Sequence, residues 1–318
     1  MISASSIERL TYCPTSAALP PIYETTTAAD QGTANHLSVA SKLLAYRDAG
    51  ILPEGVLGLI VEDTKVIAVE HSFVFDAATG DVRVLGEGVG RNYGALSATE
   101  IACTVDVVLR FQSGLVQVID WKSSSYGDTT EASTNWQLKV QALCIAAWLS
   151  VDEIEVGLCY LDTWEQDTVR FDSFQLATIQ SELFATVLRV EKAKPVDPVH
   201  LGAWCKYCPA RHACTGRAAI VNAGIMAMLG GLETIDASKY GAAWEALGAA
   251  ADAIEAAREV VKASARRAPI RLPSGKRLAL VECKRKSVDG AKLDAMLLAS
   301  GIEKPMKESR YTQLKVIK

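Results

Sequence analysis

Two short stretches of the chain carry acidic residues and a lysine at a spacing that suits metal chemistry. Residues 118–122 read Val-Ile-Asp-Trp-Lys, and Asp120 and Lys122 project to the same side because the side chains of a strand alternate between its faces. Asp106 lies 14 residues before Asp120 in a second β-type run. In a tight antiparallel pair of these runs, the two carboxylates converge near one edge of the sheet.

The chemistry that these residues favour is metal-assisted hydrolysis of a phosphodiester. Two carboxylates a few Å apart repel each other, and a divalent cation such as Mg²⁺ or Mn²⁺ relieves the repulsion. Lys122 would then orient a nucleophilic water or stabilise the charge developing on the phosphate. The alternative is a surface Asp–Lys pair, worth about 0.5 kcal/mol. His36 gains a metal role only in company with these residues, since a helical histidine is otherwise a structural residue.

The elements that must position these residues alternate in an order typical of an α/β fold. Runs rich in Val and Ile predict strands at 66–76, 81–86, 99–110, 115–120, 154–161 and 167–173. Helices are expected at 3–19, ending near Cys13-Pro14, and at 29–46, 132–150 and 174–193. This order predicts a central mixed sheet flanked by helices.

Three cysteines in the stretch WCKYCPARHAC indicate a metal centre. Cys205, Cys208 and Cys214 have the spacing C-x2-C-x5-C, in a polar and basic stretch that is unsuited to a hydrophobic core. The fourth ligand is either His212 in the same loop or Cys13 near the N-terminus. Zinc accepts three cysteines and a histidine, whereas four thiolates suit zinc or an iron–sulfur cluster. The spacing does not distinguish between these metals.

The composition is that of a globular protein without a membrane helix. Of the 318 residues, 49% are hydrophobic and 22% are charged, and no apolar run reaches the roughly 18–20 residues of a membrane span. The start of the chain lacks a secretory signal, so we expect a cytoplasmic protein of a bacterial or phage-infected cell. The eight cysteines are then thiols or metal ligands rather than disulfides.

Positive charge is concentrated at the C-terminal end. Residues 262–318 hold 15 basic and 5 acidic residues, a net charge of +10, and residues 1–261 hold 18 and 32, a net charge of −14. We predict two domains, 1–225 and an α+β extension at 226–318 with a helix and a hairpin. The basic end either binds a polyanion or is a solvated surface. Lys284, Arg285 and Lys286 are the best candidates there for contacts with phosphates.

Taken in chain order, these motifs resemble the PD-(D/E)XK nuclease superfamily. The motifs are an N-terminal Ser-x(n)-Cys-Pro element, a Gly-x3-His helix, an Asp on one strand, Asp-x-Lys on the next, a Gln-x3 helix and the closing C-x2-C-x5-C. They are most similar to its RecB-like iron–sulfur exonuclease branch, which includes CRISPR-associated, AddB-type and phage nucleases. The likeness covers residues 1–216 and implies a restriction-endonuclease-like core.

The resemblance also implies ligands and roles. A 4Fe–4S cluster would be held by Cys13, Cys205, Cys208 and Cys214. The Mg²⁺ or Mn²⁺ ligands would be His36, Asp106, Asp120 and the carbonyl of Trp121, with Lys122 as the catalytic lysine. Gln137 matches the glutamine of the family's QxxxY helix, which contacts substrate. Gln141 stands where that motif has tyrosine, a departure that could alter how the substrate strand is held.

The function implied is a metal-dependent DNA exonuclease in recombination, repair or phage DNA processing. The sequence carries no helicase motif, so unwinding would come from a partner such as a helicase or recombination protein. A homo-oligomer around DNA would explain processive digestion. The alternatives are a non-catalytic DNA-binding accessory protein that keeps the cluster, and a zinc protein with an unrelated role. The intact set of His36, Asp106, Asp120 and Lys122 favours the nuclease.

Overall fold

The computed structural model describes residues 2–22, 27–50, 64–90, 92–122, 131–205, 208–230, 240–272, 276–288 and 306–317. The chain forms two compact units, Met1–Gly216 and Arg217–Lys318. The sequence-based boundary at residue 225 falls inside helix α6 (Thr215–Gly230). In the described residues, no helix is long and apolar enough to cross a membrane.

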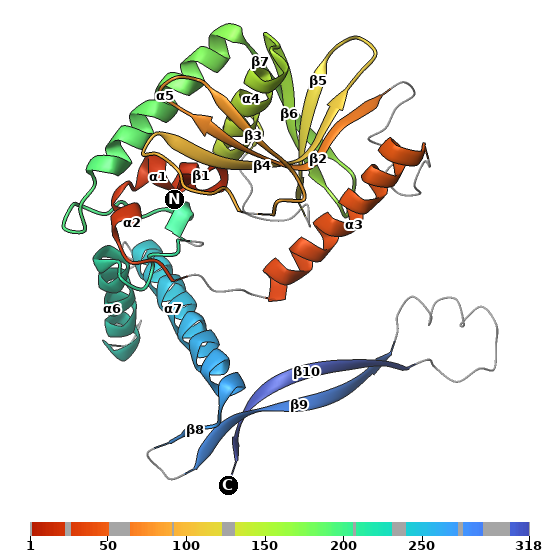
Figure 1. Ribbon diagram of the computed structural model, residues 1–318. Coiled ribbons are helices and arrows are strands. Elements are labelled where there is room, and N and C mark those ends of the chain that lie inside the picture. The colour runs from red at the N-terminus through yellow and green to blue at the C-terminus, as the bar shows by residue number, and fades with distance from the viewer. Residues whose placement is uncertain are drawn as a thin grey trace. The chain divides into compact units, whose positions relative to one another are not determined.

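Unit 1 is built on a seven-stranded mixed sheet (Figure 1). The strands are β1 (Ile2–Ser3), β2 (Lys65–Asp76), β3 (Val82–Glu87), β4 (Glu100–Arg110), β5 (Val116–Lys122), β6 (Glu153–Tyr160) and β7 (Gln166–Asp172). The order is β3-β2-β4-β5-β6-β7, and β1 pairs with β4. The β1–β4 and β5–β6 pairs are parallel and the others antiparallel.

Helices cover this sheet, which confirms the predicted fold class of an α/β core with a mixed sheet. They are α1 (Ile7–Tyr12), α2 (Thr15–Ala18), α3 (Thr27–Ala49), α4 (Trp136–Leu149) and α5 (Ser173–Lys192), with 3₁₀ turns η1 (Ala4–Ser6) and η2 (Ala203–Cys205). The single helix expected at 3–19 is instead a short strand, a 3₁₀ turn and two helices. Its break lies at Cys13-Pro14, as the proline predicted.

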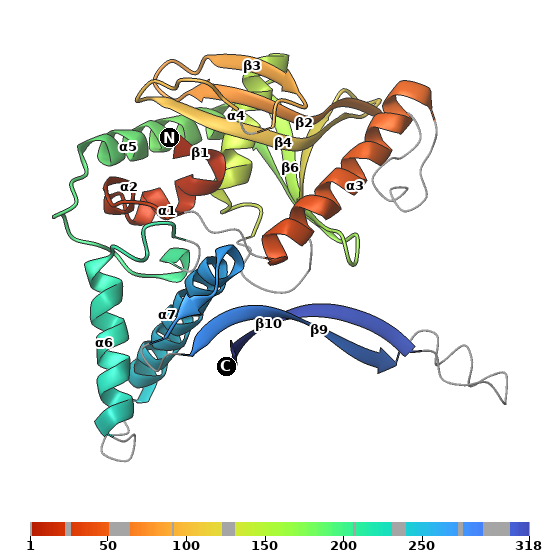
Figure 2. The same ribbon diagram turned by 60° about the horizontal axis from the view of Figure 1, so that its bottom comes forward.

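Two hydrophobic clusters hold the helices on the sheet. The larger cluster includes the buried residues of α4 and α5, whereas a second cluster joins α3 to β2, β4, β5 and β6. Figure 2 shows α3 well apart from α4 and α5. Strand β5 is buried from Val116 to Trp121 because it lies in the interior of the sheet and both of its faces are covered. This strand therefore carries Asp120 into the middle of the unit.

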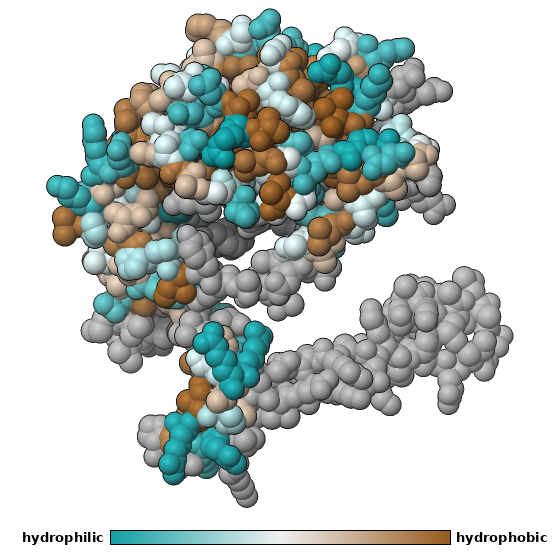
Figure 3. All heavy atoms as spheres, viewed as in Figure 1, coloured by the Kyte–Doolittle hydropathy of each residue, from teal (hydrophilic) through white to brown (hydrophobic). Residues whose placement is uncertain are grey.

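Helix α4 is the connection between the parallel strands β5 and β6. The Oδ1 atom of Asn135 caps its N-terminus by accepting a hydrogen bond from the backbone N–H of Leu138 at 3.1 Å. Nine of its fourteen residues are buried, so it packs as a core helix rather than an amphipathic surface helix. At the surface of unit 1, hydrophilic and hydrophobic residues are mixed over the face seen in Figure 3.

Unit 2 combines helices with a three-stranded antiparallel sheet. It contains α6 from its third residue on, α7 (Tyr240–Arg267), β8 (Ile270–Arg271), β9 (Arg277–Val288) and β10 (Met306–Ile317), in the sheet order β10-β9-β8. The hairpin expected at 269–284 corresponds to β8 and the start of β9, and its turn at 273–275 lies outside the described residues. Strands β9 and β10 pair over their full length of 12 residues.

Candidate active site

The two predicted carboxylates lie where strands β4 and β5 stop pairing. The antiparallel register runs from Arg110 opposite Val116 to Val107 opposite Ile119, and Asp106 and Asp120 are the next residues of the two strands. Both are buried, with 6% and 2% of their surfaces exposed. The backbone N–H of Trp121 donates a hydrogen bond to Oδ2 of Asp106 at 2.7 Å. The structure therefore brings both carboxylates to one end of the β4–β5 pair.

Helix α3 brings His36 to the same place. The Nδ1 atom of His36 lies 3.4 Å from Oδ2 of Asp106. Three and four residues later in the helix, Val39 and Ala40 are buried in the cluster against the sheet. Because residues at this spacing share one face of a helix, the packing of α3 also fixes the direction of His36.

Glu70 on β2 is a further acidic residue at this site, and sequence reasoning missed it. One ligand atom from each of His36, Glu70 and Asp106 lies within 4.8 Å of the other two. Glu70 has a φ of 45°, a left-handed conformation that is uncommon for a residue other than glycine. The only signal in the sequence is an acidic residue within the apolar run VIAVEHSFVF.

The electrostatics of these groups suit a cation. Burial raises the pKa of Asp106, and the neighbouring charge of Asp120 raises it further, against the opposing effect of His36. Burial alone would lower the pKa of His36, but the carboxylates of Asp106, Asp120 and Glu70 outweigh this effect and raise it. Buried carboxylates with this repulsion, together with an imidazole, fit a divalent cation such as Mg²⁺ or Mn²⁺.

Lys122 forms an ion pair with one carboxylate oxygen of Asp120. Its Nζ atom lies 2.6 Å from Oδ2 of Asp120, and 25% of the lysine side chain remains exposed. Burial lowers the pKa of this lysine, yet the attraction of Asp120 is stronger and the net shift is upward. Lys122 is therefore a cation at neutral pH, able to donate hydrogen bonds to an anionic oxygen.

Two glutamines from α4 bind the other oxygen of Asp120. The Nε2 atom of Gln137 donates to Oδ1 of Asp120 at 2.5 Å, and Nε2 of Gln141 donates to the same atom at 3.2 Å. The two residues are four apart and so lie on one face of the helix. Gln137 reaches the site as expected, and its contact with substrate stays a prediction. For Gln141, the sequence suggested only a departure from a motif.

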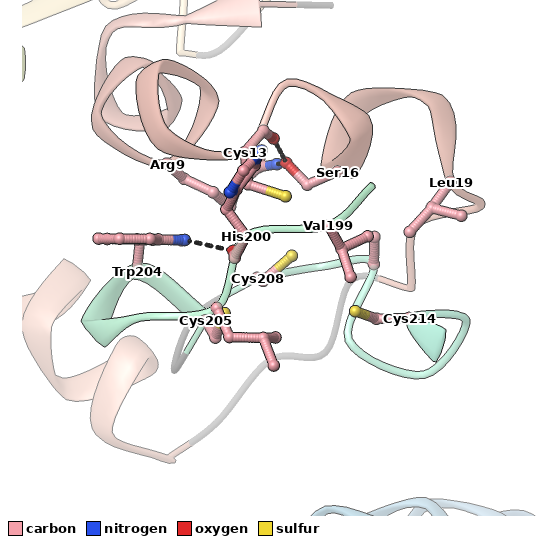
Figure 4. A pocket seen from close by; sticks show the side chains of 12 residues that line it. Arg9, Cys13, Ser16, Leu19, Val199, His200, Trp204, Cys205, Cys208 and Cys214 are labelled. Carbon is pink, nitrogen blue, oxygen red and sulfur yellow. Dashed lines mark hydrogen bonds between the residues drawn. The ribbon is translucent and has the colours of Figure 1, made fainter. Parts of the chain in front are cut away.

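Four cysteines line one cavity in unit 1. Cys13 follows α1, Cys205 is the last residue of η2, and Cys208 and Cys214 come from the segment after it; their sulfur atoms surround the same space (Figure 4). Among the residues that the structure describes, His212 is not part of this lining. Burial raises the pKa of the Cys205 thiol, and the other three thiols raise it further.

The spacing of these sulfur atoms bears on the metal that they suit. Within the described part of the chain, no three of them lie within 4.8 Å of one another. Thiolates around a single zinc ion stand closer, at about 3.8 Å, because each Zn–S bond is about 2.3 Å long. Beside the cavity, the rings of Tyr12 and Trp204 stack with centroids 4.2 Å apart.

The remaining sequence candidates lie elsewhere. Lys284, Arg285 and Lys286 are in β9 of unit 2, where the register sets them opposite Arg310, Ser309 and Glu308. Their contact with phosphates stays a prediction. Of the other histidines, His71 packs against aromatic rings, and the carbonyl of His200 accepts a hydrogen bond from the indole of Trp204.

Comparison with known proteins places the nuclease motifs in a family. The sequence model of the PD-(D/E)XK nuclease superfamily matches residues 1–215. No curated protein matches the chain. Among solved structures, the one described as "Crystal structure of SSO0001" is 15% identical, with a TM-score of 0.35 over 66% of this chain and 84% of that chain, a likeness that carries no argument about function. The matched residues include every strand of the unit 1 sheet and all residues of the candidate active site. The chain therefore belongs to the PD-(D/E)XK nuclease superfamily.

Proposed function

We propose that the chain is a metal-dependent DNA exonuclease of the RecB-like iron–sulfur branch of this superfamily. The observation that carries the proposal is the convergence of His36, Asp106, Asp120 and Lys122, from three different elements, at the end of the β4–β5 pair. A chain that had kept the fold but lost the activity would be expected to have lost at least one of them.

The cation would be held by Asp106, Asp120, His36 and the carbonyl of Trp121, with Glu70 as an additional carboxylate. When bound, Mg²⁺ or Mn²⁺ supplies a Lewis acid that polarises the phosphate and lowers the pKa of a bound water. Lys122, held beside Asp120 at 2.6 Å, donates hydrogen bonds to the attacking water or to a phosphate oxygen, where negative charge grows. His36 and the Trp121 N–H fix the orientation of the Asp106 carboxylate.

Cys13, Cys205, Cys208 and Cys214 are proposed to bind a 4Fe–4S cluster. The support for this choice is that all four cysteines line the same cavity, and four thiolates suit an iron–sulfur cluster or zinc. The cluster would link the N-terminal segment to the segment at the end of unit 1. Its role would be structural, because metal binding of this kind contributes directly to folding. Absorbance near 400 nm together with iron and sulfide analysis separates it from zinc, which is colourless.

Unit 2 is proposed to contribute to the binding of DNA. Strands β9 and β10 contain seven lysines and arginines and two glutamates, and a two-stranded ribbon is one of the shapes that the major groove of DNA admits. A helicase or recombination partner, a homo-oligomer, and a cytoplasmic location in a bacterial or phage-infected cell remain predictions.

The test is a cleavage assay on linear and circular DNA, single- and double-stranded, with Mg²⁺ or Mn²⁺. We expect linear DNA to be degraded and circles to be spared, and the activity to be lost in Lys122→Ala. The matched control is Lys192→Ala, which removes an exposed lysine at the end of α5. Lysine-dependent cutting of circles would change the class to endonuclease. A folded, brown protein without lysine-dependent cleavage would favour the accessory DNA-binding role.

A further inference from the structure

The β4–β5 ladder ends just before the site, and side chains replace the missing strand-to-strand bonds there. The last register pair is Val107 with Ile119. Beyond it, the N–H of Trp121 on β5 donates to the Asp106 side chain on β4. On β4, the carbonyl of Thr104 accepts its hydrogen bond from Nε2 of Gln141 at 3.2 Å. Buried backbone groups need such partners, so the side chains are part of how the two strands are joined.

Gln141 bridges the two strands that carry the catalytic carboxylates. Its Nε2 atom reaches both the Thr104 carbonyl on β4 and Oδ1 of Asp120 on β5, each at 3.2 Å. The side chain is fully buried, with 0% of the residue exposed. A flexible amide that is enclosed on all sides and donates to two strands fixes their relative position at this point.

This bridge also helps to fix the orientation of the Asp120 carboxylate. The amides of Gln137 and Gln141 both bind Oδ1, and Oδ2 lies beside Lys122. Gln137 is half-buried and lies near the N-terminus of α4, whereas Gln141 is enclosed one turn further along. The side chain of Gln141 therefore has less freedom to move than that of Gln137.

We propose that Gln141 is a positioning residue for the metal site, which fixes the orientation of the Asp120 carboxylate by holding its Oδ1 atom and the Thr104 carbonyl. The proposal rests on the proposed function, since it assigns the residue to the same metal site. It gives a role to the position at which this chain departs from the QxxxY motif. Replacing a residue that does not bind the metal itself but hydrogen-bonds to one of its ligands typically changes metal affinity by about 10–100-fold.

The test measures Mn²⁺ binding by calorimetry in the absence of DNA, using the full-length protein. Gln141→Met keeps an unbranched side chain of similar size and removes the amide. The expected result is a dissociation constant for Mn²⁺ at least about 10-fold higher than in the wild type, with kcat lowered at subsaturating metal and KM for DNA unchanged. Gln180→Met is the matched control, because Gln180 donates to the carbonyl of Ala77 away from the site and its loss should leave Mn²⁺ binding unchanged.

Gln141→Leu, with thermal unfolding, separates positioning from a general loss of structure. If both Gln141 variants unfold at the wild-type temperature and bind Mn²⁺ as tightly as the wild type, the positioning role is wrong. If either Gln141 variant is destabilised, its Mn²⁺ affinity is compared with that of Gln180→Met at temperatures where the two proteins are equally far below their unfolding midpoints. Equal Mn²⁺ affinities of the Gln141 variant and Gln180→Met would also overturn the positioning role. Intact Mn²⁺ binding without any lysine-dependent cleavage would refute the proposed nuclease activity instead.

Discussion

Asp106→Asn should make the metal-free protein more stable and, at the same time, insensitive to metal. The replaced carboxylate is 6% exposed and lies close to a second buried carboxylate, Asp120. Asparagine keeps an oxygen that can accept the hydrogen bond of the Trp121 N–H, which is 2.7 Å long in the wild type. The substitution therefore removes a charge without removing the bond that joins the strands.

The sign of the effect follows from the pKa of Asp106. Burial and the charge of Asp120 raise this pKa, and His36 offsets only part of the shift. An acid whose pKa is higher in the folded than in the unfolded protein stabilises the fold below its unfolded pKa of about 3.9, and this stability is lost as the pH rises through the folded pKa. Above the unfolded pKa, keeping Asp106 in its buried place is thus a cost to folding, and asparagine avoids it.

The expected gain is about 1 kcal/mol, which corresponds to a rise in Tm of about 2–4 °C for a unit of this size. Binding of Mn²⁺ at 100 times its dissociation constant should stabilise the wild type by about 2.7 kcal/mol, or about 5–10 °C. The variant should lack this response because a ligand has been removed. Added metal would therefore reverse the order of the two melting temperatures.

The assay is thermal unfolding with chelator and with Mn²⁺, at several pH values. Asp167→Asn is the control, since Asp167 also accepts a backbone N–H, that of Ala132 at 2.8 Å, but is not one of the groups that shift the pKa of Asp106. In chelator, the difference in Tm between wild type and Asp106→Asn should become smaller as the pH falls through the folded pKa of Asp106. A lower Tm for the variant in chelator, or an undiminished Mn²⁺ shift, would refute the reasoning.

Three other variants test other parts of the molecule. Cys13→Ser should remove iron and the absorbance near 400 nm and lower Tm, and full iron content in this variant would exclude Cys13 as a ligand. Glu70→Gln should raise the Mn²⁺ concentration for half-maximal cleavage by about 10-fold; an unchanged midpoint in a metal titration would remove Glu70 from the site. Lys284→Glu with Lys286→Glu should weaken DNA binding and reduce the slope of log affinity against log salt by about 0.9 for each phosphate that the protein no longer neutralises. An unchanged slope in a salt titration would place the DNA-binding surface elsewhere.

Much of the fold and the carboxylate pair could be predicted from sequence because their signals are local. The β-type runs form the strands directly, and the proline at position 14 ends a helix only a residue or two away. Asp120 and Lys122 lie two residues apart on a strand, so strand geometry alone places them together. Asp106 could be added because consecutive runs most often pair with each other.

The contribution of Glu70 could not be predicted because it depends on distant parts of the chain. It requires that β2 pair with β4 and that the backbone at Glu70 adopt a positive φ, and neither is visible as a local pattern. Gln141 was recognised only as a departure from a motif, since its two acceptors, Thr104 and Asp120, lie on different strands. For the fourth ligand beside Cys205, Cys208 and Cys214, the spacing alone leaves Cys13 and His212 open; the family resemblance implies Cys13, and Cys13 lines the cavity.

The two ends of unit 1 meet, and this has a consequence for the order in which the chain can fold. Strand β1 pairs with β4 across about 100 residues, and Cys13 shares a cavity with cysteines about 200 residues later. Contacts between such distant residues slow folding because a long loop must close before they form. During synthesis, the contact between Cys13 and these cysteines must therefore wait for residues 205–214 to leave the ribosome. We expect the nascent chain to stay sensitive to proteases until then, and the finished unit to become resistant in one late step.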